Sequence, residues 1–233
     1  METRPDVAEQ LLAQANESRR QAGVGMLQWD QSLASAALEH CRKMAAEGEL
    51  AHRYGGEASV EGRAAAAGAH FSLIEENIGL STSSTNLHQG WMNSPEHRQN
   101  LLNPSVDHIG IAVVRVRGVF YAAADFARMV PAIDRDHVEA AIGSLLRARA
   151  LKIDENHREA REACPMDRGL PAATSGNQPQ FVMRWQNSDL SKLPPALEAR
   201  LKSHEFRRAA VGSCPATEAP AAFTVYRVAV LLY

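Results

Sequence analysis

Hydrophobic residues recur every three or four positions in the first part of the chain, a spacing that predicts amphipathic helices. The first helix is expected from about Val7 to Gly23. The second is expected to start after Asp30, a good N-cap, and to end at Gly48. The apolar stripes that define the two helices are Val7, Leu11, Leu12 and Ala15, and Leu33, Ala37, Cys41 and Met44. Both helices are therefore expected to pack one face against a core.

Short helices and strands alternate in the next part of the chain. Alternating apolar and polar residues on both sides of Arg117-Gly118 predict a β-hairpin, and Asn103-Pro104 ends the helix before it. The predicted elements are a helix over Val60–Ala67, a strand over Phe71–Gly79, a helix through Leu87 and Trp91, a helix begun by Ser94-Pro95, and strands over Ile109–Val116 and Val119–Met129.

The pattern after Pro131 predicts a separate, small α+β region. A long helix is expected from Arg135 to about Ala163, followed by a strand over Phe181–Gln186 and a helix from Pro194-Pro195 to Ser203. Two further strands are expected over Phe206–Gly212 and Phe223–Leu232. The last strand is apolar on both faces, which is typical of a central or interface strand. We place the domains at residues 5–131 and 132–233.

Composition excludes some classes of function. The chain has 233 residues, a formal net charge of −2 and a pI of about 6.5, and it has no dense basic run. These values argue against nucleic-acid binding. No apolar stretch approaches the ~20 residues that a membrane-spanning helix needs. The N-terminus does not resemble a secretory signal, so the chain is either cytoplasmic or a mature form.

The three cysteines give some information on disulfides and on the redox compartment of the protein. Cys41 lies on the apolar face of its predicted helix and is expected in the core. Cys164 and Cys214 each precede a proline, and we expect them to pair. A disulfide there implies an oxidising compartment. The alternative, two reduced buried thiols, stays open.

A motif in the first region carries the chemistry. Trp91-x-x-Ser-Pro-x-His97-Arg-x-Asn100 follows Glu76-Asn77-Ile78, and an isolated His52 precedes both. This order resembles the CAP superfamily of cysteine-rich secretory proteins, insect-venom antigens, plant pathogenesis-related proteins and bacterial relatives, and this chain resembles the bacterial kind. The resemblance covers residues 5–131 and implies an α+β fold, a three-layer α-β-α sandwich. It also implies a secreted or periplasmic protein.

The resemblance implies a cleft lined by His52, Glu76 and His97. Imidazole nitrogens and a carboxylate oxygen are good zinc ligands, so zinc or another divalent cation is a candidate cofactor. His108 and Glu96 are weaker candidates for the same cleft. On the short helix Glu96 projects about 100° from His97, so it is more typical of a solvated first-turn carboxylate.

Three features depart from the eukaryotic members of the superfamily. Ser94 stands where they have a glutamate, their loop with a second cleft histidine is missing, and Glu75 replaces a glycine. Glu75 and Glu76 point to opposite sides of a strand, so only one can enter the cleft, and the motif favours Glu76.

The other motif residues have structural explanations. Trp91 is expected in the core, and Arg98 is expected to pair with a buried carboxylate such as Asp125. Asn100 is expected to bond the backbone of the loops beside it, and Asn77 is expected to tie the Glu76 segment to its neighbours through its two-sided amide.

Three functions remain open. The leading hypothesis is a non-enzymatic binding module whose cleft takes a divalent metal or a small ligand. The second is a metal-assisted peptide or ester hydrolase in which Glu76 and His97 are catalytic, although no nucleophile elbow or His-Glu-x-x-His helix is present. The third is a protein that binds lipid, an extracellular protein or another cell-envelope component, with vestigial cleft residues.

Overall fold

The computed structural model describes residues 1–169, 178–216 and 222–233, and it divides the chain into two compact units. The first unit comprises Met1–Val130 with a short stretch around Phe223, whose ring packs edge-on against Phe71. The second takes in the rest of the chain from Pro131 onward.

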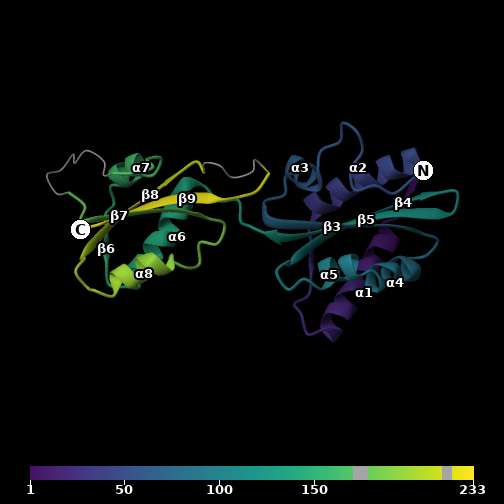
Figure 1. Ribbon diagram of the computed structural model, residues 1–233, viewed down its shortest axis with the longest axis horizontal. Coiled ribbons are helices and arrows are strands. Elements are labelled where there is room, and N and C mark those ends of the chain that lie inside the picture. Colours follow the sequence, from purple (N-terminus) through teal and green to yellow (C-terminus); the bar gives the residue numbers. More distant parts are fainter. Residues whose placement is uncertain (170–177, 217–221) are drawn as a thin grey trace. The chain divides into compact units, whose positions relative to one another are not determined.

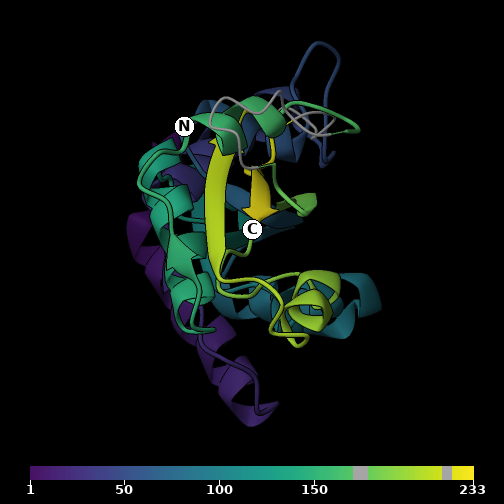
Figure 2. The ribbon, with the colours of Figure 1, turned by 90° about the vertical axis from the view of Figure 1, so that its left-hand side faces the viewer.

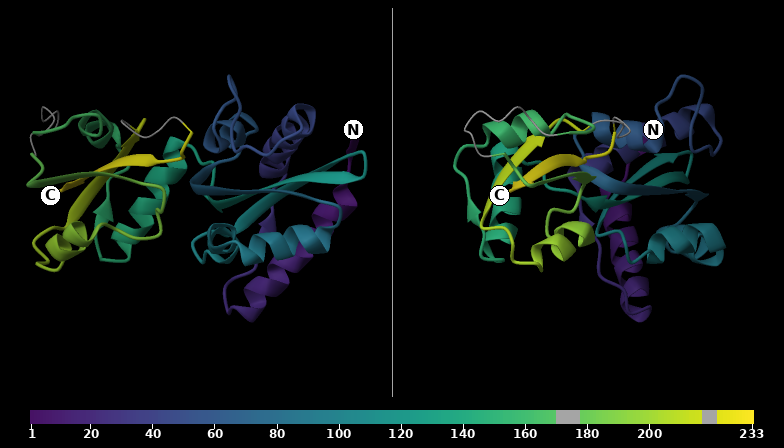
Figure 3. Two further views of the ribbon diagram at one scale, coloured as in Figure 1. Left: turned by 45° about the vertical axis from the view of Figure 1, so that its right-hand side comes forward. Right: turned by 60° about the vertical axis from the view of Figure 1, so that its left-hand side comes forward.

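The first unit is an α-β-α sandwich, as the resemblance implied. Figures 1 and 3 show α2 and α3 on one face of its sheet and α1, α4 and α5 on the other. The strand order is β1-β4-β5-β3, and β2 pairs with β4 in parallel. The helices are α1 (Pro5–Gln21), α2 (Gln31–Glu47), α3 (Val60–Ala66), α4 (Ser84–Asn93) and α5 (Pro95–Leu102). The strands are β1 (Glu2–Thr3), β2 (Gln28–Trp29), β3 (Phe71–Ser81), β4 (His108–Val116) and β5 (Val119–Met129).

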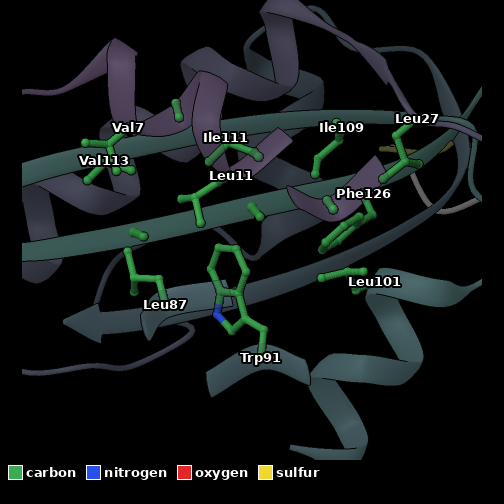
Figure 4. Close-up of a cluster of buried hydrophobic side chains, with 14 of the residues drawn as sticks. Val7, Leu11, Leu27, Leu87, Trp91, Leu101, Ile109, Ile111, Val113 and Phe126 are labelled. Atoms are coloured by element: carbon green, nitrogen blue, oxygen red, sulfur yellow. The ribbon is translucent and has the colours of Figure 1, made fainter. Parts of the chain in front are cut away.

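Alternation along the hairpin divides its side chains between two cores. Ile109, Ile111 and Val113 of β4 join the cluster under α1, α4 and α5, where Trp91 is also buried (Figure 4). Ala112 and Val114 face α2 and pack with Cys41, which is buried and free. The expected core positions of Trp91 and Cys41 are confirmed.

Helix α2 lies unusually close to the sheet at Gly110. A Cβ atom on Gly110 would sit 2.0 Å from the Ala34 nitrogen and 2.3 Å from the Leu33 carbonyl carbon. Only glycine permits this approach, which fixes the N-terminal half of α2 over β4. Asp30 caps the helix by accepting a hydrogen bond from the Leu33 N–H at 2.9 Å, as predicted.

The second unit has a mixed sheet in the order β6-β8-β9-β7. Val228 and Val230 of β9 pack with α6 and α8, whereas Ala229 and Leu231 pack with α7. Figure 1 shows α7 on one side of this sheet and α6 and α8 on the other, and Figure 2 shows the same unit facing the viewer. The central position expected for the last strand is therefore confirmed. The elements are α6 (Arg135–Arg147), β6 (Lys152–Ile153), α7 (Arg158–Ala163), β7 (Phe181–Asn187), α8 (Pro195–Leu201), β8 (Arg208–Cys214) and β9 (Tyr226–Leu232).

The cysteines of the second unit form a disulfide. The Cys164 and Cys214 sulfur atoms are 2.04 Å apart, and the bond closes a loop of 50 residues. Cys164 lies at the end of α7 and Cys214 at the end of β8, so the bond ties the helix to the sheet.

The predicted long helix from Arg135 to Ala163 is wrong. The chain leaves α6 after Arg147, and Ala150 adopts a left-handed conformation with φ of 63°. Lys152 then pairs in parallel with Arg208. The spacing of apolar residues predicted a continuous helix because Leu151, which follows the turn, packs in the same core as the apolar residues of α6. The loop expected over residues 165–179 lies partly outside the described residues.

Candidate functional site

A histidine–glutamate pair lies on the α2/α3 side of the first unit. His52, in the loop after α2, shares a hydrogen bond with Glu76 of β3, with 2.8 Å between Nδ1 and Oε1. The His52 side chain is 59 % exposed and the Glu76 side chain is 4 % exposed. The pair therefore presents an imidazole at the surface and anchors it to a buried carboxylate.

Arg63 of α3 occupies the second oxygen of that carboxylate. Its guanidinium donates to Glu76 Oε2 and also to the main-chain oxygens of His52, at 3.2 Å, and Ala58, at 3.1 Å. Both Glu76 and Arg63 are buried. A buried carboxylate needs such a partner, and Arg63 also fixes the loop that carries His52.

Two further residues, His40 and Glu57, lie beside these three. We call the five residues together the His52 cluster: His40, His52, Glu57, Arg63 and Glu76. His40 is fully buried, and its Nδ1 lies 2.8 Å from Glu57 Oε1. Its Nε2 lies 3.9 Å from Glu76 Oε2. His40, Glu57 and Arg63 were not predicted from the sequence, because their partners come from other segments of the chain. A lone arginine in an Ala-rich helix was the only signal.

Asn77 and Asn100 attach α5 to strand β3. The Asn77 amide donates to the His97 main-chain oxygen at 2.9 Å, and the Asn100 amide donates to the Glu76 oxygen at 3.3 Å. Trp91 Nε1 donates to the Ile78 oxygen at 2.9 Å. Two edge carbonyls of β3 are thus bonded to motif side chains. The expected role of Asn77 is confirmed, whereas Asn100 bonds the main chain of strand β3 rather than that of a loop.

The neighbouring carboxylates Glu75 and Glu76 separate as expected. Glu75 points to the opposite face of β3, where Asn103 donates to it at 2.8 Å. Burial raises the pKa of Glu75, opposed by the Asn103 hydrogen bond. Only Glu76 belongs to the His52 cluster.

The two motif histidines have opposite charge tendencies. The hydrogen bond and charge of Glu76 raise the pKa of His52. Partial burial lowers the pKa of His97, and the positive charge of His52 lowers it further. The charge of His52 therefore acts on His97, and His52 holds its proton more tightly than His97 does.

Asp125 lies beneath the cluster. It is fully buried on β5, opposite Glu76 in the strand register, and neither of its carboxyl oxygens has a hydrogen-bond partner among the described residues. Burial, and then the neighbouring charge of Glu76, hold the pKa of Asp125 well above its usual range. A carboxylate in the middle of an apolar strand was the sequence signal for this residue.

The other three residues predicted near the cleft, His108, Glu96 and Arg98, have different surroundings. His108 Nδ1 is 2.8 Å from Asp107 Oδ1. Glu96 is exposed in the first turn of α5, as predicted for a solvated carboxylate. The predicted Arg98–Asp125 ion pair is wrong: Arg98 is exposed on α5 and Asp125 is fully buried on β5. A basic side chain at the surface of α5 cannot reach that carboxyl.

The His52 cluster does not fit a divalent metal. Among the described residues no three His, Cys, Asp or Glu side chains are arranged to hold one. Both oxygens of Glu76 are already bonded, and one of them contacts a guanidinium, whose positive charge repels a cation.

A known protein family matches this fold and motif order. Residues 12–130, just over half of the chain, match the model of CAP, the cysteine-rich secretory protein family. The chain belongs to the CAP family. Its CAP domain contains the His52 cluster, and the match ends where the second unit begins.

Relatives of the CAP domain include bacterial proteins. The chain is 32% identical over 111 residues to the uncharacterized membrane protein YlbC of Bacillus subtilis (strain 168), covering 46% of this chain and 31% of that protein. It spans about a third of that relative. In the part of the chain that the structure describes, no helix is both long and apolar enough to cross a membrane.

Two solved structures are similar to the CAP domain. An outer surface protein from Borrelia burgdorferi is 21% identical with a TM-score of 0.50, over 53% of this chain and 93% of that one. An extracellular protein with an SCP domain from Bacillus anthracis str. Ames is 26% identical with a TM-score of 0.49, over 53% and 41%.

Proposed function

We propose that this protein is a non-enzymatic binding module outside the cytoplasm, and that its His52 cluster binds a small anionic ligand without a metal. The observation that carries the proposal is the double engagement of Glu76, whose two oxygens contact His52 and Arg63. A carboxylate held in this way orients an exposed imidazole, which is left as the ligand-binding group.

The chemistry of the exposed groups favours an anion. His52 keeps its proton to a higher pH than an ordinary histidine, because Glu76 stabilises the imidazolium. His97, whose pKa is lowered by burial, offers a neutral ring nearby. A carboxylate or phosphate group can accept a charge-assisted hydrogen bond from His52 and a second bond from His97.

A hydrolase that uses Glu76 as general base is less well supported. A base must have an oxygen available to a water molecule, and the two oxygens of Glu76 already accept hydrogen bonds. The disulfide in the second unit supports an oxidising compartment, and therefore a location outside the cytoplasm.

Histidine ring resonances, followed by NMR during titration with inorganic phosphate or acetate, test the proposal. His137 is the matched control, because it is also exposed and lies 2.7 Å from an aspartate oxygen. We expect saturable shifts at His52 and His97 that His52→Gln abolishes and His137→Gln leaves unchanged. Equal, unsaturable shifts at His52 and His137 would show only general screening and refute an anion site.

Metal content is measured on the same protein. Elemental analysis of chelator-free protein and zinc calorimetry are expected to show no stoichiometric zinc. One zinc per chain that is lost in His52→Gln would overturn the metal-free proposal. Chelator-sensitive turnover of ester or peptide libraries would favour the hydrolase instead.

A further inference from the structure

A second concave site lies in the CAP domain and shares no residue with the His52 cluster. It is a cavity of about 440 Å³ between α1, α2 and β4. Its walls are mostly apolar: Ala8 and Leu12 come from α1, Ala34 and Leu38 from α2, and Trp29 from β2. The Trp29 side chain is among the exposed large hydrophobic groups of the molecule.

The floor of the cavity is the edge of strand β4 that faces away from β5. Along this outer edge, β4 pairs with β2 at His108 and Ile109, and with β1 at Val114 and Arg115. No described strand pairs with the outer side of β4 between these two stretches. Consecutive residues rise ~3.3 Å along a strand, so the gap from Gly110 to Val113 is roughly 10 Å long.

Main-chain groups of Ile111 face this gap. The oxygens of Ile109 and Val113 accept hydrogen bonds from Asp30 and Arg4 on the outer edge, each at 2.9 Å, so by alternation Ile111 presents its N–H and C=O to the same edge. Ile111 is buried, and the described residues offer these two groups no partner. Buried main-chain groups nearly always have a partner, so the floor lacks one donor and one acceptor.

We propose that this cavity binds a short peptide of two or three residues in an extended conformation. The main chain of the peptide would pair with Ile111 and fill the gap between β1 and β2, as in strand addition to a sheet edge. Its side chains would alternate between the wall at Leu12 and the wall at Leu38, which favours large apolar residues.

Charge at the rim indicates which end of the peptide is bound. Glu9 is exposed on α1 and has no ion-pair partner among the described residues, whereas Arg4 is already paired with Asp6 at 2.6 Å. The uncompensated charge at the rim is therefore negative. It favours a peptide with a free, positively charged N-terminus.

Titration of the full chain with trileucine tests the site, with NMR of the Ile111 amide and the Trp29 indole as readouts. We expect saturable shifts of both signals. Methylation of the central peptide nitrogen should weaken binding about tenfold, because one hydrogen bond is lost. N-terminal acetylation should weaken it by about threefold in the wild type, the size expected of an exposed charge pair.

Two variants separate the contributions. Glu9→Gln should remove the difference between trileucine and its acetylated form, whereas Glu47→Gln, an exposed glutamate on α2 away from the cavity, should keep it. Equal binding of trileucine and its N-methylated form would show apolar contact alone and overturn strand pairing. No shift with trileucine, or shifts with dodecanoate only, would also overturn the proposal.

Discussion

At the residue scale, the CAP domain concentrates its buried carboxylates in one place. Among the described residues, Glu57, Glu76 and Asp125 share one buried guanidinium, that of Arg63. His52 and His40 also contact the carboxylates, and Asp125 alone has no hydrogen-bond partner among the described residues. Since burying an ionised carboxylate without a partner is costly, folding favours a neutral Asp125.

The first prediction concerns the pH dependence of stability at Asp125. Its raised pKa means that the folded chain binds a proton that the unfolded chain releases above pH ~4. The free energy of unfolding should therefore fall as pH rises from 4 toward the folded pKa. Asp125→Asn removes this group, so the decline should be shallower in the variant.

Urea unfolding at pH 4 to 8 measures this effect. Asp154→Asn, which changes a carboxylate of the second unit that is not fully buried, serves as the control and should keep the wild-type slope. Identical slopes for the wild type and Asp125→Asn would contradict a neutral, buried Asp125.

The second prediction concerns Arg63. Arg63→Met should destabilise the first unit by about 3 kcal/mol, because it leaves buried carboxylates without their cation. The exposed Arg42→Met should have little effect. The double variant Arg63→Met/Glu76→Gln should lose clearly less stability than the two single changes together, since a neutral amide in place of the Glu76 carboxylate would no longer need the guanidinium. Additive losses would show that Arg63 and Glu76 are energetically independent.

At the element scale, close contacts between helix and sheet recur in both units. Gly110 lets α2 approach β4, and Gly212 lets α7 approach β8, where an added Cβ would sit 2.2 Å from the Ala160 carbonyl carbon. In each case the clash would be with main chain rather than with a flexible side chain. The helix as a whole would have to move.

The third prediction follows from these contacts. Gly110→Ala and Gly212→Ala should each destabilise their own unit by roughly 4 kcal/mol, at the upper end of single-substitution effects. Gly90→Ala is the matched control: nothing lies within 4 Å of the added atom in α4, so a gain of about 0.5–1 kcal/mol is expected. Thermal unfolding measures all three. A loss for Gly90→Ala as large as that for Gly110→Ala would refute the steric explanation.

Local sequence signals predicted most elements of the first unit. Asp30 and Gly48 bound α2, and Arg117-Gly118, both with positive φ, forms the turn of the hairpin. The turn at Ala150, which separates α6 from β6, was not predicted, because no glycine or proline marks this left-handed position. Apolar spacing continued across the turn because residues on both sides contribute to one core.

The site was predictable only in part, for the same reason. The motif order indicated His52 and Glu76, and the structure joins them. Arg63 could not be assigned, because its role depends on the packing of α3 beside β3 rather than on local sequence. The open edge at Ile111 has no sequence signature at all, since it arises where β1 and β2, from separate segments, both stop short.

At the scale of the whole molecule, the two units have separate hydrophobic cores. The disulfide lies entirely within the second unit and joins Cys164 at the end of α7 to Cys214 at the end of β8. In the chain-entropy account of cross-linking, a disulfide stabilises by restricting the unfolded chain that it closes. Its contribution therefore belongs to the unit whose loop it spans.

The fourth prediction uses this locality. Cys164→Ala/Cys214→Ala should lower the free energy of unfolding of the second unit by about 4 kcal/mol, the value for a loop of this length. Amide hydrogen exchange resolves the units: protection should fall in β8 and β9 and stay unchanged in β4 and β5. A reductant should reproduce the effect in the wild type and do nothing further to the variant. An equal loss of protection in β4 and β5 would show that the CAP domain depends on the second unit for its stability.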